Sequence, residues 1–218
     1  NWMQQAMTAG VWDETLRAAQ ACLAQKPLKP ALMAAALALQ ELGRPAEALP
    51  YLDTLLAHDP VHSLARNRRA LSLALLGRVD EARRAWDRLR REETTFALAH
   101  LNAAEFEWMG GNLERARTIL EEGLEVCPVE LDLWNRRIQM AVRHEGLEAS
   151  ARWARRALER FPSGGAGLWH RLVALQAATE GRLDEALRWI DEGRVHFPED
   201  PELLGLRQRL GGEGGPRG

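Results

Sequence analysis

Hydrophobic residues along the chain follow the spacing of amphipathic helices, and glycine and proline residues separate these helices. In the clearest case, Ala116, Ile119 and Leu120 recur at the i, i+3, i+4 spacing of one helix face. Gly111 precedes this stretch and Pro128 follows it, as expected for residues that end helices. The pattern therefore predicts short helices joined by tight turns.

The same alternation of apolar faces and turn residues continues through the chain, and it predicts no strands. Helices are expected over residues 2–9, 12–24, 32–42, 45–57, 64–76, 80–92, 97–109, 113–127, 133–142, 148–160, 168–178, 184–196 and 201–210.

The helices recur with a fixed period. Gly43, Gly77 and Gly111 are 34 residues apart, and Gly181 lies 70 residues further on. Each of these glycines is followed five residues later by an alanine, and a column of prolines runs in phase with them. A period of this length in helix-forming sequence is the signature of a helical solenoid. We therefore expect an all-α chain, an α-solenoid of stacked antiparallel helix pairs.

The period also predicts the domain organisation, a single array over residues 1–210. Its units are expected at about residues 1–28 (a partial unit), 29–62, 63–96, 97–130, 131–166 and 167–200, with a capping helix over 201–210. The glycine-rich residues 211–218 are expected to form a flexible tail.

Small residues form columns where the two helices of a pair would cross. One column holds Ala36, Ala70, Ala104, Ile138 and Ala174, and another holds Ala48, Ala82, Ala116, Ser150 and Ala186. Small side chains let helices approach to about 8 Å. These columns resemble the tetratricopeptide repeat (TPR) family, in which they accompany a closing proline. The chain departs from the family pattern at Thr94, which replaces a closing proline, and at Gly146, which lies one residue late.

The resemblance implies a right-handed superhelix whose first helices line a concave, peptide-binding groove. The groove-facing residues would then include Asn67, Arg68, Leu71, Leu75, Leu98, Leu101, Asn102, Glu105, Trp108, Met109, Asn135, Arg136, Arg143 and Arg171. Asparagine can bond an extended peptide backbone, and arginine can hold a carboxylate in a bidentate fork. The set loosely resembles the family's carboxylate clamp and asparagine ladder. Because the clamp's lysine is absent, a chaperone C-terminus is a poor candidate ligand.

Composition argues against several classes of partner. The chain is 28% charged with a net charge of −2, and the segment 97–130 is acidic, so a phosphate-tracking surface is not expected. No apolar run reaches the roughly 18 residues that a membrane span needs. Lys26 and Lys29 are the only lysines among 29 basic residues, a composition typical of a GC-rich bacterial genome. The compartment is not indicated, although a cytoplasmic location is slightly favoured.

No catalytic, metal or cofactor motif is present: the chain lacks GxxxxGK[ST], HExxH, GxSxG and CxxC. His100 and His170 occupy equivalent places in two first helices and are expected to pack between helices. Trp86, Trp153 and Trp189 fall in apolar stripes and are expected in the core. Cys22 and Cys127 are interpreted as separate packing residues.

Two functions from different classes fit these features. The first is a non-catalytic scaffold that binds a protein or peptide segment, with self-association as a further possibility. The second is the substrate-recruiting TPR arm of a larger enzyme, such as a glycosyltransferase or sulfotransferase. The incomplete first unit and the glycine-rich end would suit a piece cut from a longer protein.

The packing columns make a direct prediction for Ala116. Ala116→Arg would force a charge between packed helices and should unfold the neighbouring units. Thermal unfolding followed by circular dichroism measures this effect. A melting curve like that of the wild type would contradict the assignment of Ala116 to a buried column.

Overall fold

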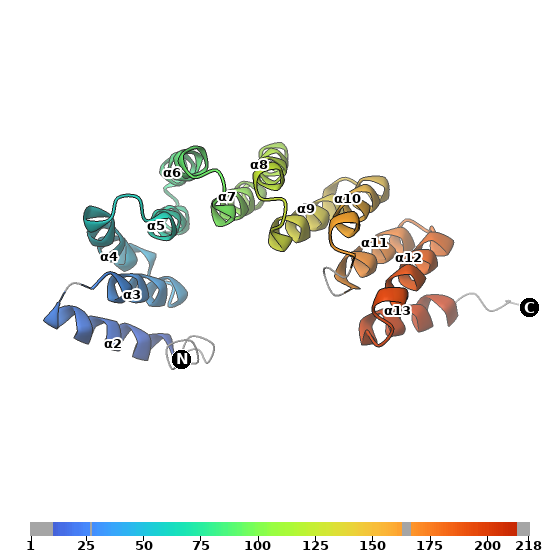
Figure 1. Ribbon diagram of the computed structural model, residues 1–218, viewed down its shortest axis with the longest axis horizontal. Helices are drawn as coiled ribbons and strands as arrows, with labels where there is room; N and C mark the ends of the chain where they lie inside the picture. Colours follow the sequence, from blue (N-terminus) through green and yellow to red (C-terminus); the bar gives the residue numbers. More distant parts are fainter. Residues whose placement is uncertain (1–10, 27, 163–166, 213–218) are drawn as a thin grey trace, which may run out of the picture. The chain divides into compact units, whose positions relative to one another are not determined.

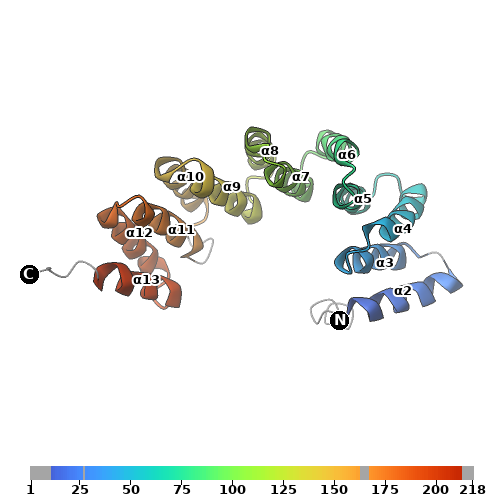
Figure 2. The same ribbon diagram turned by 180° about the vertical axis from the view of Figure 1, so that it is seen from behind.

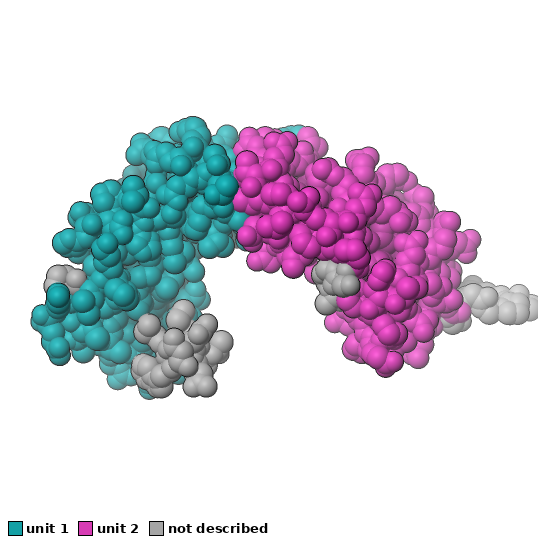
Figure 3. Space-filling view, in the orientation of Figure 1, with its two compact units in different colours: residues 1–116 teal, residues 117–218 magenta. Residues whose placement is uncertain are grey.

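The computed structural model describes residues 11–26, 28–162 and 167–212, and in these ranges the regular structure is entirely helical (Figure 1). The chain divides into two compact units, residues 1–116 and 117–218 (Figure 3). The helix expected over residues 2–9 and the tail from residue 213 lie outside the described residues.

Unit 1 contains α2 (Trp12–Gln25), α3 (Lys29–Glu41), α4 (Pro45–His58), α5 (Ser63–Leu75), α6 (Val79–Glu92) and α7 (Ala97–Met109). The division between the units falls within α8 (Leu113–Val126), after Ala116. Unit 2 contains the rest of α8 and then α9 (Leu131–His144), α10 (Leu147–Arg160), α11 (Leu168–Thr179), α12 (Leu183–His196) and α13 (Pro201–Gly212).

Within each unit the helices pack in chain order. In unit 1, consecutive helices contact each other, and α5 also contacts α3 and α7, the neighbouring first helices (Figure 2). In unit 2, α11 has the same relation to α9 and α13. This is the packing of a solenoid, in which each hairpin touches only its neighbours. The prediction of an all-α fold of stacked antiparallel helix pairs is confirmed.

Most helix boundaries agree with the sequence pattern, and the differences have local causes. Helix α3 begins at Lys29 rather than Leu32, because Pro30 lies in its first turn, where a missing N–H costs no hydrogen bond. Helix α13 runs on to Gly212, so the first two residues of the expected tail are helical.

The recurrent glycines close the hairpins. Gly43, Gly77, Gly111 and Gly181 all have φ between 71° and 79°, the left-handed region that glycine enters without strain. At the first of these turns, the Arg44 N–H donates to the Leu39 carbonyl over 2.8 Å, and the Gly43 N–H donates to the Gln40 carbonyl. The same pair of bonds recurs at the other three turns. This is a Schellman cap, which satisfies the last carbonyls of the first helix and reverses the chain.

The small-residue columns lie at the centre of the helix contacts. Ala36, Ala70 and Ala104 are buried, as are the corresponding Ile138 and Ala174 of unit 2. The second column, from Ala48 to Ala186, is fully buried throughout. Trp86, Trp153 and Trp189 are also buried, which confirms their expected place in the core.

Cys22 is an exception, because its side chain is exposed whereas Cys127 is buried. The equivalent residues later in the chain, such as Leu55 and Leu89, are buried, and a first helix precedes each of them in its own unit. For α2 that helix would be residues 2–9, which lie outside the described residues. The interpretation of Cys22 as a packing residue was therefore wrong for the part of the chain that the structure describes.

Gly193 allows a prediction about helix approach. A Cβ at this position would lie 2.9 Å from the Cβ and Cγ of His170 on α11. Gly193→Ala should therefore lower the free energy of unfolding by about 1–3 kcal/mol through overpacking. The matched control is Gly205→Ala within α13, where a Cβ would meet nothing within 4 Å. That substitution should stabilise the fold by up to about 1 kcal/mol. Chemical denaturation of both variants checks the pair, and equal effects would contradict the close approach.

Candidate functional site

A cavity of about 460 Å³ lies between α5, α6 and α7 of unit 1. We call it the apolar cavity, because its wall is largely hydrocarbon. It is lined by Leu71, Ala74, Leu75, Val79, Arg83, Trp86, Asn102, Glu105, Phe106, Glu107, Met109, Gly110 and Asn112. All of these residues belong to unit 1.

Large apolar side chains stand exposed around the apolar cavity. Leu75, the last residue of α5, is 57% exposed, and Val79, the first residue of α6, is 43% exposed. Met109 ends α7 and is 81% exposed. The hairpin turns place these three residues at helix ends. Single exposed apolar residues are normal on a protein surface, but several around one concavity indicate an interaction site.

The floor of the apolar cavity is held in place by an aromatic pair and one hydrogen bond. Trp86 is buried, and its ring centroid lies 5.2 Å from that of Phe106. The Trp86 indole N–H donates to the Asn67 Oδ1 over 2.8 Å. A buried indole needs such an acceptor. The floor is therefore formed before any ligand arrives.

Part of the lining of the apolar cavity belongs to a network of charges centred on Glu107, which is 2% exposed. Its carboxylate accepts bonds from Arg83 (2.6 and 3.0 Å), Arg115 (2.9 Å) and the Asn112 side chain (2.8 Å). Burial on its own raises the pKa of Glu107, but the bonds from Arg83 and Asn112 and the two guanidinium charges outweigh it, so the pKa lies below its ordinary value. The carboxylate is thus ionised and fully occupied at neutral pH, and it fixes α6, α7 and the start of α8 to one another.

The structure brings only some of the predicted groove residues to the apolar cavity. Asn102 and Met109 line it, together with Leu71, Leu75 and Glu105. Leu98 is exposed, while Leu101 and Trp108 are half-buried, and none of these three lines the cavity. The sequence pattern did not indicate Val79, Arg83 or Phe106. The groove was expected from first helices alone, whereas Val79 and Arg83 lie on a second helix. The sequence did contain one indication of this site. Glu107 is an acid at a repeat position that holds Leu39 and Leu73 in the earlier units.

Two predicted asparagines serve the packing of the fold. Asn67 is 1% exposed and accepts the bond from Trp86. Asn135 in unit 2 is half-buried, and its Oδ1 accepts the Trp169 indole N–H over 2.7 Å. Both asparagines accept an indole N–H, but the donor lies on the second helix of the same unit for Asn67 and on the next first helix for Asn135. Arg68 is half-buried beside Asn67, its Nε lacks a partner, and burial lowers the pKa of its guanidinium.

The remaining predicted residues belong to unit 2. Arg171 is paired with Asp200 at 2.9 Å and with Glu202 at 3.0 Å, so it ties α11 to the start of α13. Arg136 is half-buried and Arg143 is exposed. Because Arg171 already holds two carboxylates, it is a weaker candidate for binding a ligand's carboxylate.

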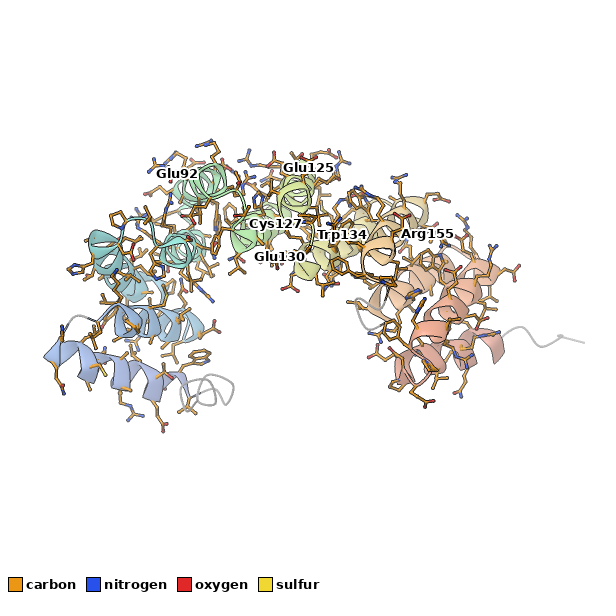
Figure 4. The ribbon with its side chains drawn as sticks, viewed as in Figure 1. Glu92, Glu125, Cys127, Glu130, Trp134 and Arg155 are labelled. Atoms are coloured by element: carbon orange, nitrogen blue, oxygen red, sulfur yellow. The ribbon has the colours of Figure 1, made fainter. Side chains whose placement is uncertain are left out.

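Unit 2 has a cavity of its own, of about 560 Å³, lined partly by Trp134, Trp153 and Arg156. Figure 4 labels Trp134 on α9. The guanidinium groups of Arg137 and Arg156 each lie 4.4 Å from the Trp153 ring centroid. Arg137 is buried, with Glu121 and Glu145 as partners. The tryptophan is therefore occupied by cations of the chain itself, and this cavity is a weaker ligand site than the apolar cavity.

The histidines have structural places. His100 and His170 are buried, which confirms the expectation that they pack between helices. The His62 Nδ1 accepts the Ala65 N–H over 3.3 Å and so caps α5. Among the described residues, no group of three or more His, Cys, Asp or Glu side chains is placed to hold a metal ion. No helix in the same ranges is long and apolar enough to span a membrane.

Comparisons with known proteins agree with the helical-repeat fold. The family model described as tetratricopeptide repeat matches residues 33–92 and 76–129. PilW, a type IV pilus biogenesis factor, is similar in structure with a TM-score of 0.67 and 17% identity, covering 94% of each chain. A TPR protein from Parabacteroides merdae has a TM-score of 0.60 and 15% identity, covering 95% of this chain and 82% of its own.

A thermophilic TPR protein from Thermus thermophilus is 21% identical with a TM-score of 0.53, covering 85% of this chain and 98% of its own. These likenesses show the fold. No curated protein matches the chain in sequence.

The Glu107 network gives a pH-dependent prediction. Glu107→Gln removes the charge that pairs with Arg83 and Arg115, and should lower the free energy of unfolding at neutral pH by about 1–3 kcal/mol. Because the folded-state pKa of Glu107 is depressed, its contribution is present above the unfolded-state pKa. The contribution is lost as the pH falls through the folded-state pKa, so the difference between wild type and variant should shrink in acid.

Urea denaturation at neutral and acid pH measures this difference. The matched control is Glu81→Gln, which breaks an exposed pair with Arg78 and should change stability much less than Glu107→Gln does. A wild-type-to-Glu107→Gln difference that did not depend on pH would show that the carboxylate charge is unimportant.

Proposed function

Because this chain belongs to the tetratricopeptide repeat family, we propose that it is a non-catalytic scaffold that binds a partner's peptide segment in the apolar cavity of unit 1. The family and the fold support a role in protein interaction. The observation that carries the finer proposal is the ring of exposed Leu75, Val79 and Met109 around a concavity with a preformed floor.

The apolar cavity suits one large apolar side chain of the peptide. Burying a leucine or phenylalanine side chain contributes about 1.5–3 kcal/mol. The charges of Glu107, Arg83 and Arg115 satisfy one another, so an apolar group can enter without breaking an ion pair. The partner's anchor is therefore hydrophobic.

Polar groups at the edge of the apolar cavity can orient the peptide. Asn102 lines the cavity from α7, and its side-chain amide can both donate to and accept from an extended backbone. Leu98, Asn102, Glu105 and Met109 follow one another at helical spacing along one face of α7. We propose that the peptide leaves the cavity along this face, with Leu98, Leu101 and Trp108 as further contacts.

A preformed site keeps the cost of binding low. The aromatic floor and the Glu107 network fix the cavity before binding, so most of the entropy lost is that of the peptide. Some of the residues expected to contact the peptide remain predictions: Arg68 in unit 1, and Asn135, Arg136, Arg143 and Arg171 in unit 2.

Leu75→Glu tests the proposal. The variant places a charge at the mouth of the apolar cavity and should weaken peptide binding by about tenfold to hundredfold. The fold should be unaffected, because Leu75 is exposed at the end of α5. A displayed library of random peptides, panned on the wild-type protein, supplies the probe, and calorimetry with the enriched peptide measures its affinity.

The matched control is Val195→Glu on α12 in unit 2, where the native side chain is 77% exposed and lies outside the cavity. The control should bind the enriched peptide as the wild type does. Unchanged affinity of Leu75→Glu, or enriched peptides that carry no large apolar residue, would rule out the apolar cavity as the binding site.

A further inference from the structure

A second, smaller cavity of about 260 Å³ lies between α4, α5 and α6, and its chemistry is different. It is lined by Leu56, Pro60, Arg66, Arg69, Ala85 and Arg88, and we call it the arginine cavity. It shares no lining residue with the apolar cavity. Three guanidinium groups and no carboxylate line the arginine cavity, whereas Leu56, Pro60 and Ala85 form an apolar wall.

The three arginines differ in how far their charges are balanced. Arg66 pairs with Glu93 at 3.2 Å and with Glu92, which is labelled in Figure 4. Arg69 pairs with Asp53 at 2.7 Å. Arg88 is exposed, and no hydrogen bond or ion pair joins it to another residue in the described ranges. Arg88 therefore brings an uncompensated positive charge to a concave surface.

Positive charge continues from the arginine cavity along α6. Arg84, Arg88 and Arg91 are all exposed, and their i, i+4, i+7 spacing places them on one face of the helix. Like charges at this spacing repel each other. None of the three forms an ion pair with a described residue, although the carboxylate of Glu81 interacts with the charge of Arg84. The repulsion between Arg88 and Arg91 is not relieved within the part of the chain that the structure describes. A bound anion would relieve it.

We propose that the arginine cavity and this face of α6 dock an acidic segment of a partner protein. One carboxylate of the segment enters the arginine cavity and pairs with Arg88, while an apolar neighbour rests on Leu56 and Pro60. Further carboxylates face Arg84 and Arg91. Guanidinium groups hold carboxylates in bidentate pairs, which supplies both affinity and orientation.

The surrounding charges favour an acidic peptide over a nucleic acid. Asp53, Glu92 and Glu93 stand among the arginines, and they would repel a continuous phosphate backbone. A peptide can place its carboxylates between these acids. The apolar wall of the arginine cavity also matches an aliphatic side chain better than a sugar–phosphate chain.

Fluorescence anisotropy tests this docking surface with a labelled peptide of alternating glutamate and leucine. The wild-type protein should bind the peptide, and the affinity should fall as salt is added. Arg88→Gln should weaken binding about tenfold, the loss expected for one charge-assisted pair. Glutamine has a similar helix propensity, and circular dichroism should show an unchanged fold.

The matched control is Arg152→Gln on α10 in unit 2, another exposed arginine that has no ion pair with a described residue. It should bind as tightly as the wild type, and so should Leu75→Glu, because Leu75 is not part of the arginine cavity. Absence of wild-type binding, or an equal loss in Arg88→Gln and Arg152→Gln, would overturn the proposal. Tighter binding of a single-stranded oligonucleotide than of the peptide would overturn it in favour of nucleic acid.

Discussion

The close contact between helices at the alanine columns is the constraint on which the rest of the structure depends. Ala36, Ala48 and their equivalents are fully buried, because the helix backbones approach one another at these points. Larger residues such as Leu52 and Trp86 fill the space beside each contact. The exposed helix ends then follow from the geometry of the hairpins, because each glycine-capped turn must leave the core and return to it.

The core changes character where polar residues enter the columns. Glu107 stands where Leu39 and Leu73 stand in earlier units, and Arg83 and Arg115 approach it as partners. A buried carboxylate without partners would lower the stability of the fold. A glutamate at this position therefore requires cations from the neighbouring helices. Of this network, Glu107 and Arg83 line the apolar cavity. One unusual residue in a repeat thus gives this cavity a charged part of its lining.

The sequence predicted the helices and their buried faces far better than the site. Glycine and proline positions located the hairpins because these residues act on the backbone locally. The role of Asn67 could not be predicted in this way, because it depends on the indole of Trp86 reaching across to its side chain. For the same reason a groove assigned to first helices missed Val79 and Arg83. Periodicity identifies a residue's face on its own helix, but not the neighbour that it meets.

Helices α5 and α6 present different chemistry on different faces. Leu71 and Leu75 of α5 line the apolar cavity, whereas Arg66 and Arg69 of the same helix line the arginine cavity. On α6, Arg83 and Trp86 line the first cavity, and Ala85 and Arg88 line the second. Helical periodicity separates these sets, since residues one or two apart in sequence point in different directions. A single hairpin can therefore hold an apolar anchor on one face and an acidic segment on another, and neither site needs the other's residues.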